Sequence, residues 1–247
     1  MEEKYDDEVV LQVEGIHTES GLQDISFELH RGEILGVCGL SDAGIHDLGK
    51  VIFNHSGITC GKVMANSAKK PLKKPVDFIR AGGAYLSKDR DSDGLMLDAN
   101  IRNNVATPSA IDMSSLLYFL NPRKVSEFAE KIVSQFEIKT QSINCTVKRL
   151  SGGNKQKVNL SRWLVRDLKF IVLDCPTRGV DVRVKAYIYS LLKKAKSEGL
   201  AILLISDELS EAIGMADRIL VLKEHRLSAV LSRNNDYHEE KIIGAML

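Results

Sequence analysis

The sequence predicts an α/β fold built on a largely parallel sheet. Short apolar runs alternate with amphipathic stretches along the chain, as in proteins where strands and helices follow one another. Two runs, 170–173 and 201–205, are apolar at every position, which is typical of parallel strands buried on both faces. A third run, 33–38, leads through a glycine-rich segment into a helical pattern.

The composition is that of a soluble globular protein. The chain has 247 residues, of which 44% are hydrophobic, enough for one large domain or two small ones. Its 34 Lys and Arg residues nearly balance 33 Asp and Glu residues, so we expect no nucleic-acid partner. The four cysteines form no CxxC pair, which disfavours disulfides or a zinc site and indicates a reducing cytosol. No apolar run is long enough to span a membrane.

The N-terminal part is expected to be rich in strands, followed by a helix. Ile45, Leu48 and Ile52 recur at helical spacing, which places that helix shortly after Gly39. The predicted strands cover 9–13, 25–29 and 33–38.

The middle of the chain, about 96–147, is expected to be mainly helical. Its clearest helix begins at Asn121 and Pro122, because Asn is a good N-cap and Pro fits the first helical position. Four apolar residues then share one face of that helix: Val125, Phe128, Ile132 and Phe136.

The α/β alternation returns after this block. A helix is expected between the strands 170–173 and 201–205, with Gly199 placed to end it. Further strands are expected at 219–222 and 227–231. The apolar face of the helix consists of Val184, Ile188, Leu191 and Ala195.

No internal repeat, low-complexity tract or linker interrupts this pattern. We therefore expect one domain over residues 1–247. Its α/β core would comprise about 1–95 and 148–247, with a helical subdomain of about 96–147 inserted into it.

The glycine-rich segment has the form of a phosphate-binding loop, in which backbone N–H groups and a helix N-terminus face the anion. Two registers fit. The first loop runs over 39–44 and is followed by Ile45 and His46; the second runs over 44–49 and is followed by Lys50. The first is favoured, because the loop must begin where the strand ends. Lys50 is then an ordinary lysine on a helix surface.

The first register lacks the charged groups that phosphate chemistry needs. Ile45 stands where a lysine should reach the phosphates, and it offers neither charge nor hydrogen bond. His46 stands where a hydroxyl should bind Mg²⁺, and imidazole is a poor ligand for that hard cation. A turn that never bound nucleotide is the alternative interpretation. The candidate nucleotide-binding residues are Gly39, Ser41, Asp42, Ala43, Gly44, Ile45 and His46.

Two further motifs follow the loop. Ser151 can cap a helix whose first N–H groups are left open by Gly152 and Gly153, which makes a site for a phosphate. Asp174 ends an apolar strand, the position at which P-loop enzymes hold Mg²⁺. Chance is a poor explanation for this order of motifs.

The set GLSDAG, LSGGNKQK, FIVLDCPTRGVDV and LLISDELSEA resembles the ABC ATPase family, over about 10–231. YLSKDRDSDGL and PTRGVDV resemble the ATP-binding proteins of ribose-, galactose- and xylose-type sugar importers, and in particular the second of their two tandem ATPase domains. The resemblance implies a P-loop NTPase core with an N-terminal antiparallel β part and an inserted helical subdomain.

The resemblance also implies cofactors and partners. ATP and Mg²⁺ would lie between this domain and a second ABC ATPase domain arranged head to tail. Ser151, Gly152, Gly153 and Gln156 would then act in trans on the partner's nucleotide. A membrane permease would dock on 85–95 and the helical block, and would hold the protein at the cytoplasmic face of the membrane. The acidic start of the chain suggests the C-terminal half of a tandem protein.

The departures from the family pattern fall on the catalytic positions. Beside Ile45 and His46, the γ-phosphate sensor is Lys88, the catalytic glutamate is Cys175 and the switch histidine is Asp207. A thiol cannot replace a carboxylate that orients water at neutral pH. We therefore expect hydrolysis at this site to be lost, with Asp174 left to assist a weakly held Mg²⁺-nucleotide.

These observations favour a domain that donates LSGG to a companion ATPase domain while its own loop stays silent. Two alternatives remain open. One is a soluble ABC protein without a permease, acting in translation or DNA maintenance. The other is an interaction module that has no nucleotide chemistry at either site.

Overall fold

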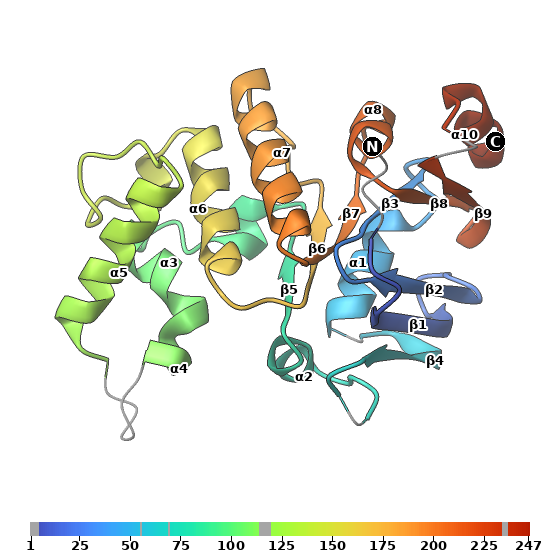
Figure 1. The fold of residues 1–247 in the computed structure, drawn as a ribbon, viewed down its shortest axis with the longest axis horizontal. Helices are drawn as coiled ribbons and strands as arrows, with labels where there is room; N and C mark the ends of the chain where they lie inside the picture. The colour runs from blue at the N-terminus through green and yellow to red at the C-terminus, as the bar shows by residue number, and fades with distance from the viewer. Residues whose placement is uncertain (1–4, 55, 69, 114–119, 234–236) are drawn as a thin grey trace. The chain divides into compact units, whose positions relative to one another are not determined.

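The computed structural model describes residues 5–54, 56–68, 70–113, 120–233 and 237–247 (Figure 1). The chain forms two compact units. The first comprises Met1–Lys88, Leu168–Cys175 and Tyr189–Leu247, and the second comprises Asp89–Asp167 and Pro176–Ile188. The boundary passes through helix α7 (Val182–Ser197). The division into a core and an inserted subdomain at the boundaries expected above stays a prediction.

The first unit contains a small antiparallel sheet in the order β2-β1-β4. It consists of β1 (Val9–Thr18), β2 (Ile25–His30) and β4 (Ile58–Ala65). The sequence predicted β2 closely, but β1 is twice as long as the predicted 9–13, and β4 was missed. The first half of β4 is largely exposed, so it lacks the buried alternation that marks a strand.

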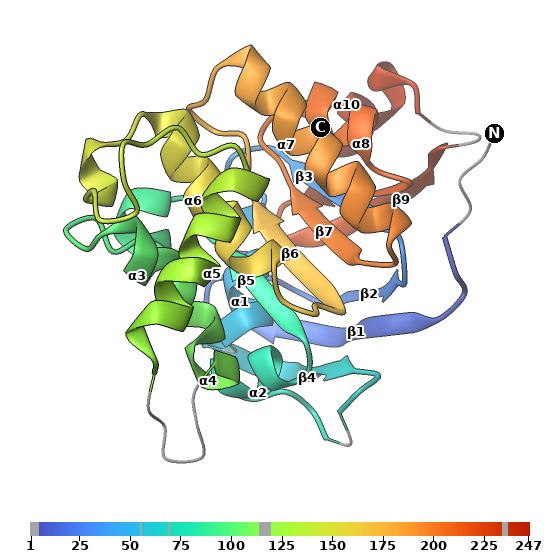
Figure 2. The same cartoon turned by 60° about the vertical axis from the view of Figure 1, so that its left-hand side comes forward.

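A six-stranded sheet in the order β5-β6-β7-β3-β8-β9 forms the centre of the first unit (Figure 2). All neighbours pair in parallel except β8 and β9, which are antiparallel. Because five strands are parallel, their carboxyl ends meet at one edge of the sheet. The strands are β3 (Ile34–Gly39), β5 (Gly83–Leu86), β6 (Phe170–Asp174), β7 (Ala201–Ile205), β8 (Arg218–Lys223) and β9 (Arg226–Ser232).

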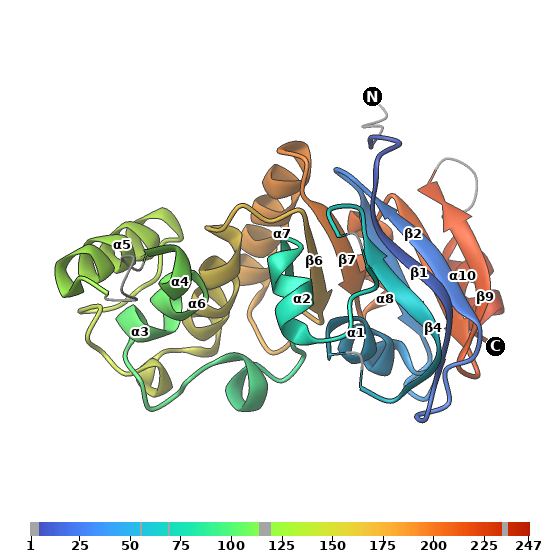
Figure 3. The same cartoon turned by 90° about the horizontal axis from the view of Figure 1, so that it is seen from below.

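Helix α1 (Ile45–Asn54) lies between the two sheets (Figure 3). Its buried residues Ile45, Leu48 and Ile52 share one hydrophobic core with Leu11 of the small sheet and Val172 of the large sheet. Burial of each such side chain contributes about 1.5–3 kcal/mol relative to exposure. This packing fixes the helix, and with it the loop that precedes it.

The second unit is mainly helical. Helix α5 begins as the sequence predicts, with the Asn121 side chain accepting a hydrogen bond from Arg123 N–H and with Pro122 in the first turn. Ile132 and Phe136 of its predicted apolar face are buried. The helices of this unit are α3 (Ile101–Ala106), α4 (Ala110–Met113), α5 (Pro122–Gln135) and α6 (Gly152–Leu164).

The part of the first unit that the structure describes also contains α2 (Pro75–Arg80), α8 (Leu209–Met215) and α10 (Glu239–Met246). Helix α8 packs on β3 and α10 packs on β8. Within the described ranges, no helix combines the length and the apolar character needed to cross a membrane.

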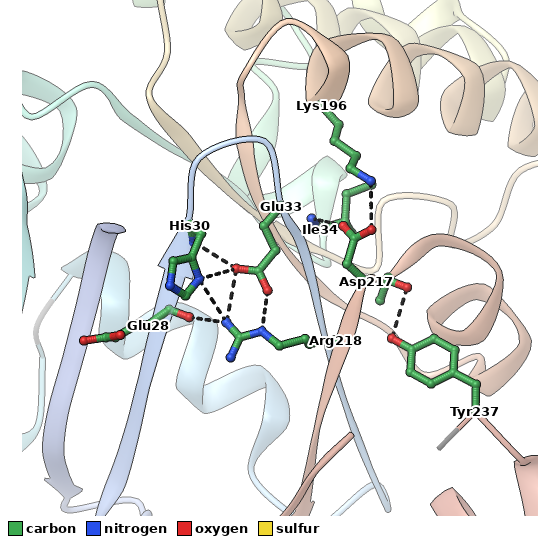
Figure 4. A network of polar contacts seen from close by, with 9 residues as sticks. Glu28, His30, Glu33, Ile34, Lys196, Asp217, Arg218 and Tyr237 are labelled. Carbon is green, nitrogen blue, oxygen red and sulfur yellow. Dashed lines mark hydrogen bonds and ion pairs between the residues drawn. The ribbon is translucent and has the colours of Figure 1, made fainter. Parts of the chain in front are cut away.

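A polar network joins the amino ends of β3 and β8, at the edge of the sheet opposite the strand carboxyl ends (Figure 4). The fully buried Glu33 carboxylate accepts hydrogen bonds from Arg218, at 2.6 and 3.1 Å, and from the backbone N–H of His30 at 2.8 Å. Asp217 binds Ile34 N–H and the Lys196 ammonium, both at 2.8 Å. These bonds tie two parallel strands to the end of α7.

Candidate nucleotide site and signature motif

The strand, loop and helix take the first of the two registers. Strand β3 ends at Gly39 and α1 begins at Ile45, so the loop covers 40–44. Ile45 is 1% exposed and packs in the core, whereas Lys50 is exposed on α1. The second register is therefore excluded, because Lys50 lies within the helix and not at its start.

Glycine is required at both ends of the loop. A Cβ on Gly39 would lie 2.7 Å from the carbonyl oxygen of Leu222. Gly44 has φ +84°, and a Cβ there would lie 2.7 Å from Nδ1 of His225. His225 belongs to the turn between β8 and β9 and lies against the loop. This contact was not apparent from the sequence, because 181 residues separate the two positions.

Four polar side chains converge at the edge formed by the strand carboxyl ends. His46 lies in the first turn of α1, Lys88 follows β5, Asp174 ends β6 and Asp207 follows β7. All four belong to the first unit. The parallel topology brings them together from four separate parts of the chain.

His46 is at the centre of this ion cluster, which we define as His46, Lys88, Asp174 and Asp207. Its Nδ1 lies 2.7 Å from Asp174 Oδ1, and its Nε2 lies 2.8 Å from Asp207 Oδ1. Lys88 Nζ lies 2.7 Å from the same Nε2 and 3.1 Å from Asp207 Oδ2. When Nε2 carries a proton it donates to Asp207; when it does not, it accepts from Lys88. Lys88 is thus part of the site and is not a solvated surface lysine.

The cluster balances its own charge. The hydrogen bond with Asp174 raises the pKa of His46, burial acts in the opposite direction, and the Asp174 and Asp207 charges add to the rise. Burial opposes ionisation of Asp207, but the hydrogen bond from Lys88 and the charge of His46 outweigh it and hold the pKa of that carboxyl below its ordinary value. With His46 protonated, two cations face two carboxylates, and no net positive charge remains for a triphosphate.

Cys175 occupies a strained and buried position beside the cluster. Its φ is +48°, a value uncommon for a residue with a side chain, and its backbone N–H donates to Ile205 O at 2.9 Å. The residue is 6% exposed, and burial raises the pKa of the thiol above its ordinary value. A neutral thiol here cannot take a proton from water.

The residues present do not fit Mg²⁺. One nitrogen of His46, one carboxylate oxygen of Asp174 and the sulfur of Cys175 lie within 4.8 Å of one another. Mg²⁺ requires oxygen ligands in octahedral geometry and binds nitrogen and sulfur poorly. Asp174 has only its Oδ2 to offer a cation, since its Oδ1 already pairs with His46. The hard oxygen site expected of a hydrolytic P-loop has been replaced by a softer donor set.

The signature motif keeps the form expected from the sequence. Ser151 caps α6, accepting hydrogen bonds from the backbone N–H of Asn154 at 3.4 Å and from its side chain at 3.0 Å. Ser151 is exposed, and Gly152 and Gly153 are half-buried. A Cβ on Gly153 would lie 2.8 Å from the Val184 side chain, so the glycine allows close packing within the second unit.

Gln156 differs from the other signature residues. It is 2% exposed, and its side-chain amide donates to the carbonyl oxygen of Pro176 within the same unit. It therefore holds α6 against the segment after β6 and does not present its amide beside Ser151. Asp181 accepts hydrogen bonds from the N–H groups of Arg183 and Val184, both at 3.0 Å, and so caps α7.

The segment 85–95 ends in a π-helical turn, Arg90–Gly94, in the second unit. The Arg90 guanidinium donates to the carbonyl oxygens of Arg178 at 2.6 Å and Gly179 at 3.4 Å. Asp91 pairs with Lys155 of α6 at 2.8 Å. The turn is thus bound both to the signature helix and to the segment that precedes α7.

The glycine loop, the capped Ser-Gly-Gly helix and the aspartate at the end of β6 define an ATP-binding cassette. The sequence pattern of the ABC transporter family matches residues 22–178, and the chain belongs to this family. The P-loop NTPase fold expected from the motifs is confirmed by two solved structures. A nucleotide-free ATP-binding cassette from an ABC transporter has a TM-score of 0.77 at 20% identity, covering 96% of this chain and 95% of that one. A dimeric cassette in a post-hydrolysis state, bound to ADP and Pi, has a TM-score of 0.77 at 19% identity, covering 91% and 99%.

Curated relatives are more similar in sequence. The ribose import ATP-binding protein RbsA of Bacillus licheniformis is 38% identical over 235 residues, which are 95% of this chain and 47% of that protein. A putative ribose/galactose/methyl galactoside import ATP-binding protein of Agrobacterium fabrum is 36% identical over 234 residues, 95% of this chain and 46% of that protein. The chain thus spans about half the length of these relatives.

Proposed function

We propose that this chain is one of two ATP-binding domains of a sugar importer of the ribose and galactose type. In this proposal its own phosphate loop is silent, and Ser151, Gly152 and Gly153 complete the nucleotide site of the second domain. The names of the two relatives support the transport of sugars, and their double length supports a tandem arrangement.

The ion cluster is the observation that best supports an inactive nucleotide site in this chain. His46, Lys88, Asp174 and Asp207 pair with one another at distances of 2.7–3.1 Å, where a working site needs free charges for Mg²⁺ and phosphate. A triphosphate entering the loop must break these pairs and also approach the exposed Asp42. ATP and Mg²⁺ therefore bind weakly here, and no step of hydrolysis is assigned to this site.

The signature motif supports the second half of the proposal. The N-terminus of α6 carries the partial positive charge of a helix dipole, and the exposed Ser151 lies at that end. These groups suit the phosphates of a nucleotide held by another domain. Gln156 takes no part in this proposed contact with the partner's phosphates, because its side chain is buried. A permease docks through the turn Arg90–Gly94 and the helices of the second unit, which holds the protein at the cytoplasmic face of the membrane.

The test is reconstitution with a companion ATPase domain that has an intact lysine loop. The isolated chain is expected to turn over ATP at least about 100-fold more slowly than the mixture, since loss of a general base alone costs about 10²–10⁴-fold. The variant Ser151→Asp keeps the helix cap, because Asp is also a good N-cap, but places a carboxylate against the phosphates. It should abolish stimulation, while the exposed helix-surface variant Ser197→Ala should not.

Two results would refute the proposal. Turnover by the isolated chain at the rate of the mixture would disprove the silent site. Full stimulation by Ser151→Asp, with companion binding unchanged, would disprove the trans role of the signature motif.

A further inference from the structure

The residues that exclude Mg²⁺ from the phosphate loop form a donor set of a different kind. One nitrogen of His46, one oxygen of Asp174 and the sulfur of Cys175 lie within 4.8 Å of one another. Ligands in a tetrahedral zinc site, with bonds of about 2.0–2.3 Å, are separated by roughly 3.3–3.8 Å. Binding of zinc therefore requires side-chain rotations that bring the three atoms to that spacing.

A second observation points to a ligand at this place. Asp174 is completely buried, and its Oδ2 has no hydrogen-bond partner among the described residues. A buried carboxylate oxygen without a partner is costly, and a bound cation is one way to satisfy it. We infer that His46, Asp174 and Cys175 form a binding site for a borderline transition metal ion such as Zn²⁺. The CxxC spacing that usually marks zinc sites is not needed, because the fold brings the ligands together.

The surrounding charges suit such an ion. His46 Nδ1 faces Asp174 and becomes the metal ligand, while Nε2–H donates to Asp207 at 2.8 Å. A carboxylate that accepts from the second nitrogen of a metal-bound histidine is the usual outer partner of a zinc site. Lys88 pairs with the other oxygen of Asp207 at 3.1 Å. Cys175 releases its thiol proton to solvent on coordination, so the divalent ion, the thiolate and the Asp174 carboxylate sum to zero charge.

His46 is 20% exposed, which leaves room for a water molecule as the fourth ligand. The site requires only this chain, so it does not depend on the proposed transport function. In this chain a metal ion would then lie beside the loop that holds nucleotide in other proteins of the same fold.

The test uses the full chain, freed of metal with a chelator, and Zn²⁺ or Co²⁺ as the probe. Calorimetry is expected to show one Zn²⁺ per chain, with affinity unchanged by a large excess of Mg²⁺. Co²⁺ should give the visible bands of tetrahedral coordination and a thiolate charge-transfer band in the near ultraviolet. Cys175→Ser should remove that band, and the exposed-thiol variant Cys60→Ser should keep it.

Two further variants make the result decisive. His46→Asn should weaken Zn²⁺ binding strongly, while His238→Asn, at an exposed histidine, should not. Asp207→Asn leaves the three ligands in place, changes the carboxylate that pairs with His46, and should weaken binding about 10–100-fold, even if His46→Asn fails to fold. Absence of Zn²⁺ binding, equal competition by Mg²⁺, or unchanged affinity in both Cys175→Ser and Asp207→Asn would overturn the inference.

Discussion

Individual residues decide what the phosphate loop of this chain can do. Ile45 packs in the core, and His46 ties Asp174 to Asp207. Each replacement has a partner in the structure, so the substitutions form a consistent set and not scattered losses. Under the proposed function, these side chains form a local network in place of a site for a triphosphate.

His46 is therefore expected to support the stability of the metal-free protein. Replacement by Ala leaves the buried Asp174 carboxylate without its hydrogen-bond partner, which should lower the free energy of unfolding by about 1–3 kcal/mol or more. Lys50→Ala, on the exposed side of the same helix, should change it by less than about 0.5 kcal/mol. Urea denaturation in the presence of a chelator measures both. Equal effects of the two substitutions would show that the cluster has no structural role.

Restoring one catalytic residue should not restore hydrolysis. In Cys175→Glu a carboxylate returns beside Asp174, but Ile45 supplies no charge for the phosphates, and the position has φ +48°. We expect ATP turnover by the isolated variant to stay at least about 100-fold below that of the reconstituted pair. A phosphate-release assay checks this. Turnover close to that of the pair would mean that Cys175 was the single block.

Among the secondary-structure elements, the turn between β8 and β9 has an unexpected role. Glu224 and His225 both have positive φ, at +47° and +63°, and the His225 ring lies against Gly44 of the loop. The turn between β8 and β9 thus contacts the phosphate loop at Gly44.

Gly44→Ala tests this support. The new Cβ would lie 2.7 Å from His225 Nδ1 and 2.9 Å from Leu22, at a φ of +84°, so we expect a loss of about 1–3 kcal/mol in the free energy of unfolding. Gly214→Ala is the matched control, because Gly214 lies within α8 and no other described residue comes within 4 Å of its added Cβ. That substitution should stabilise the protein by about 0.5–1 kcal/mol. Thermal or urea unfolding should therefore show a lower free energy of unfolding for Gly44→Ala and a higher one for Gly214→Ala.

The helix starts and the strand–loop–helix unit could be predicted from the sequence because they depend on neighbouring residues. Asn121 and Pro122 begin α5, Ser151 caps α6, and the loop register follows from the length of the strand before it. The ion cluster could not be predicted, since His46 and Asp207 are 161 residues apart and meet only through the sheet. The sequence showed five unusual residues at catalytic positions, and it did not show that four polar side chains there bind one another.

For the first unit as a whole, two polar networks lie at opposite edges of one sheet. The candidate site occupies the carboxyl ends of the parallel strands, and the network of Glu33 and Arg218 occupies the amino ends of β3 and β8 (Figure 4). Strand β3 therefore links the two features, because the phosphate loop follows its carboxyl end and Glu33 precedes its amino end, with buried residues of the strand between them.

Arg218→Met is expected to be strongly destabilising. It leaves the fully buried Glu33 carboxylate without its charged partner, and loss of one member of a buried ion pair costs about 3–5 kcal/mol. Arg31→Met, which breaks an exposed pair with Glu8 at 3.5 Å, should cost no more than about 1 kcal/mol. Denaturant titration of both variants gives the comparison. A cost for Arg218→Met as small as that for Arg31→Met would show that the network is dispensable.

The burial of Ile45 has an evolutionary consequence. A lysine at this position would remove an aliphatic side chain from the core and add a third cation to a cluster that is already neutral. The substitution Ile45→Lys alone is therefore expected to lower the stability of the protein. Under the proposed function it would return no turnover by itself, so selection acting on that single substitution has no gain to follow, and descendants of this chain are expected to retain Ile45.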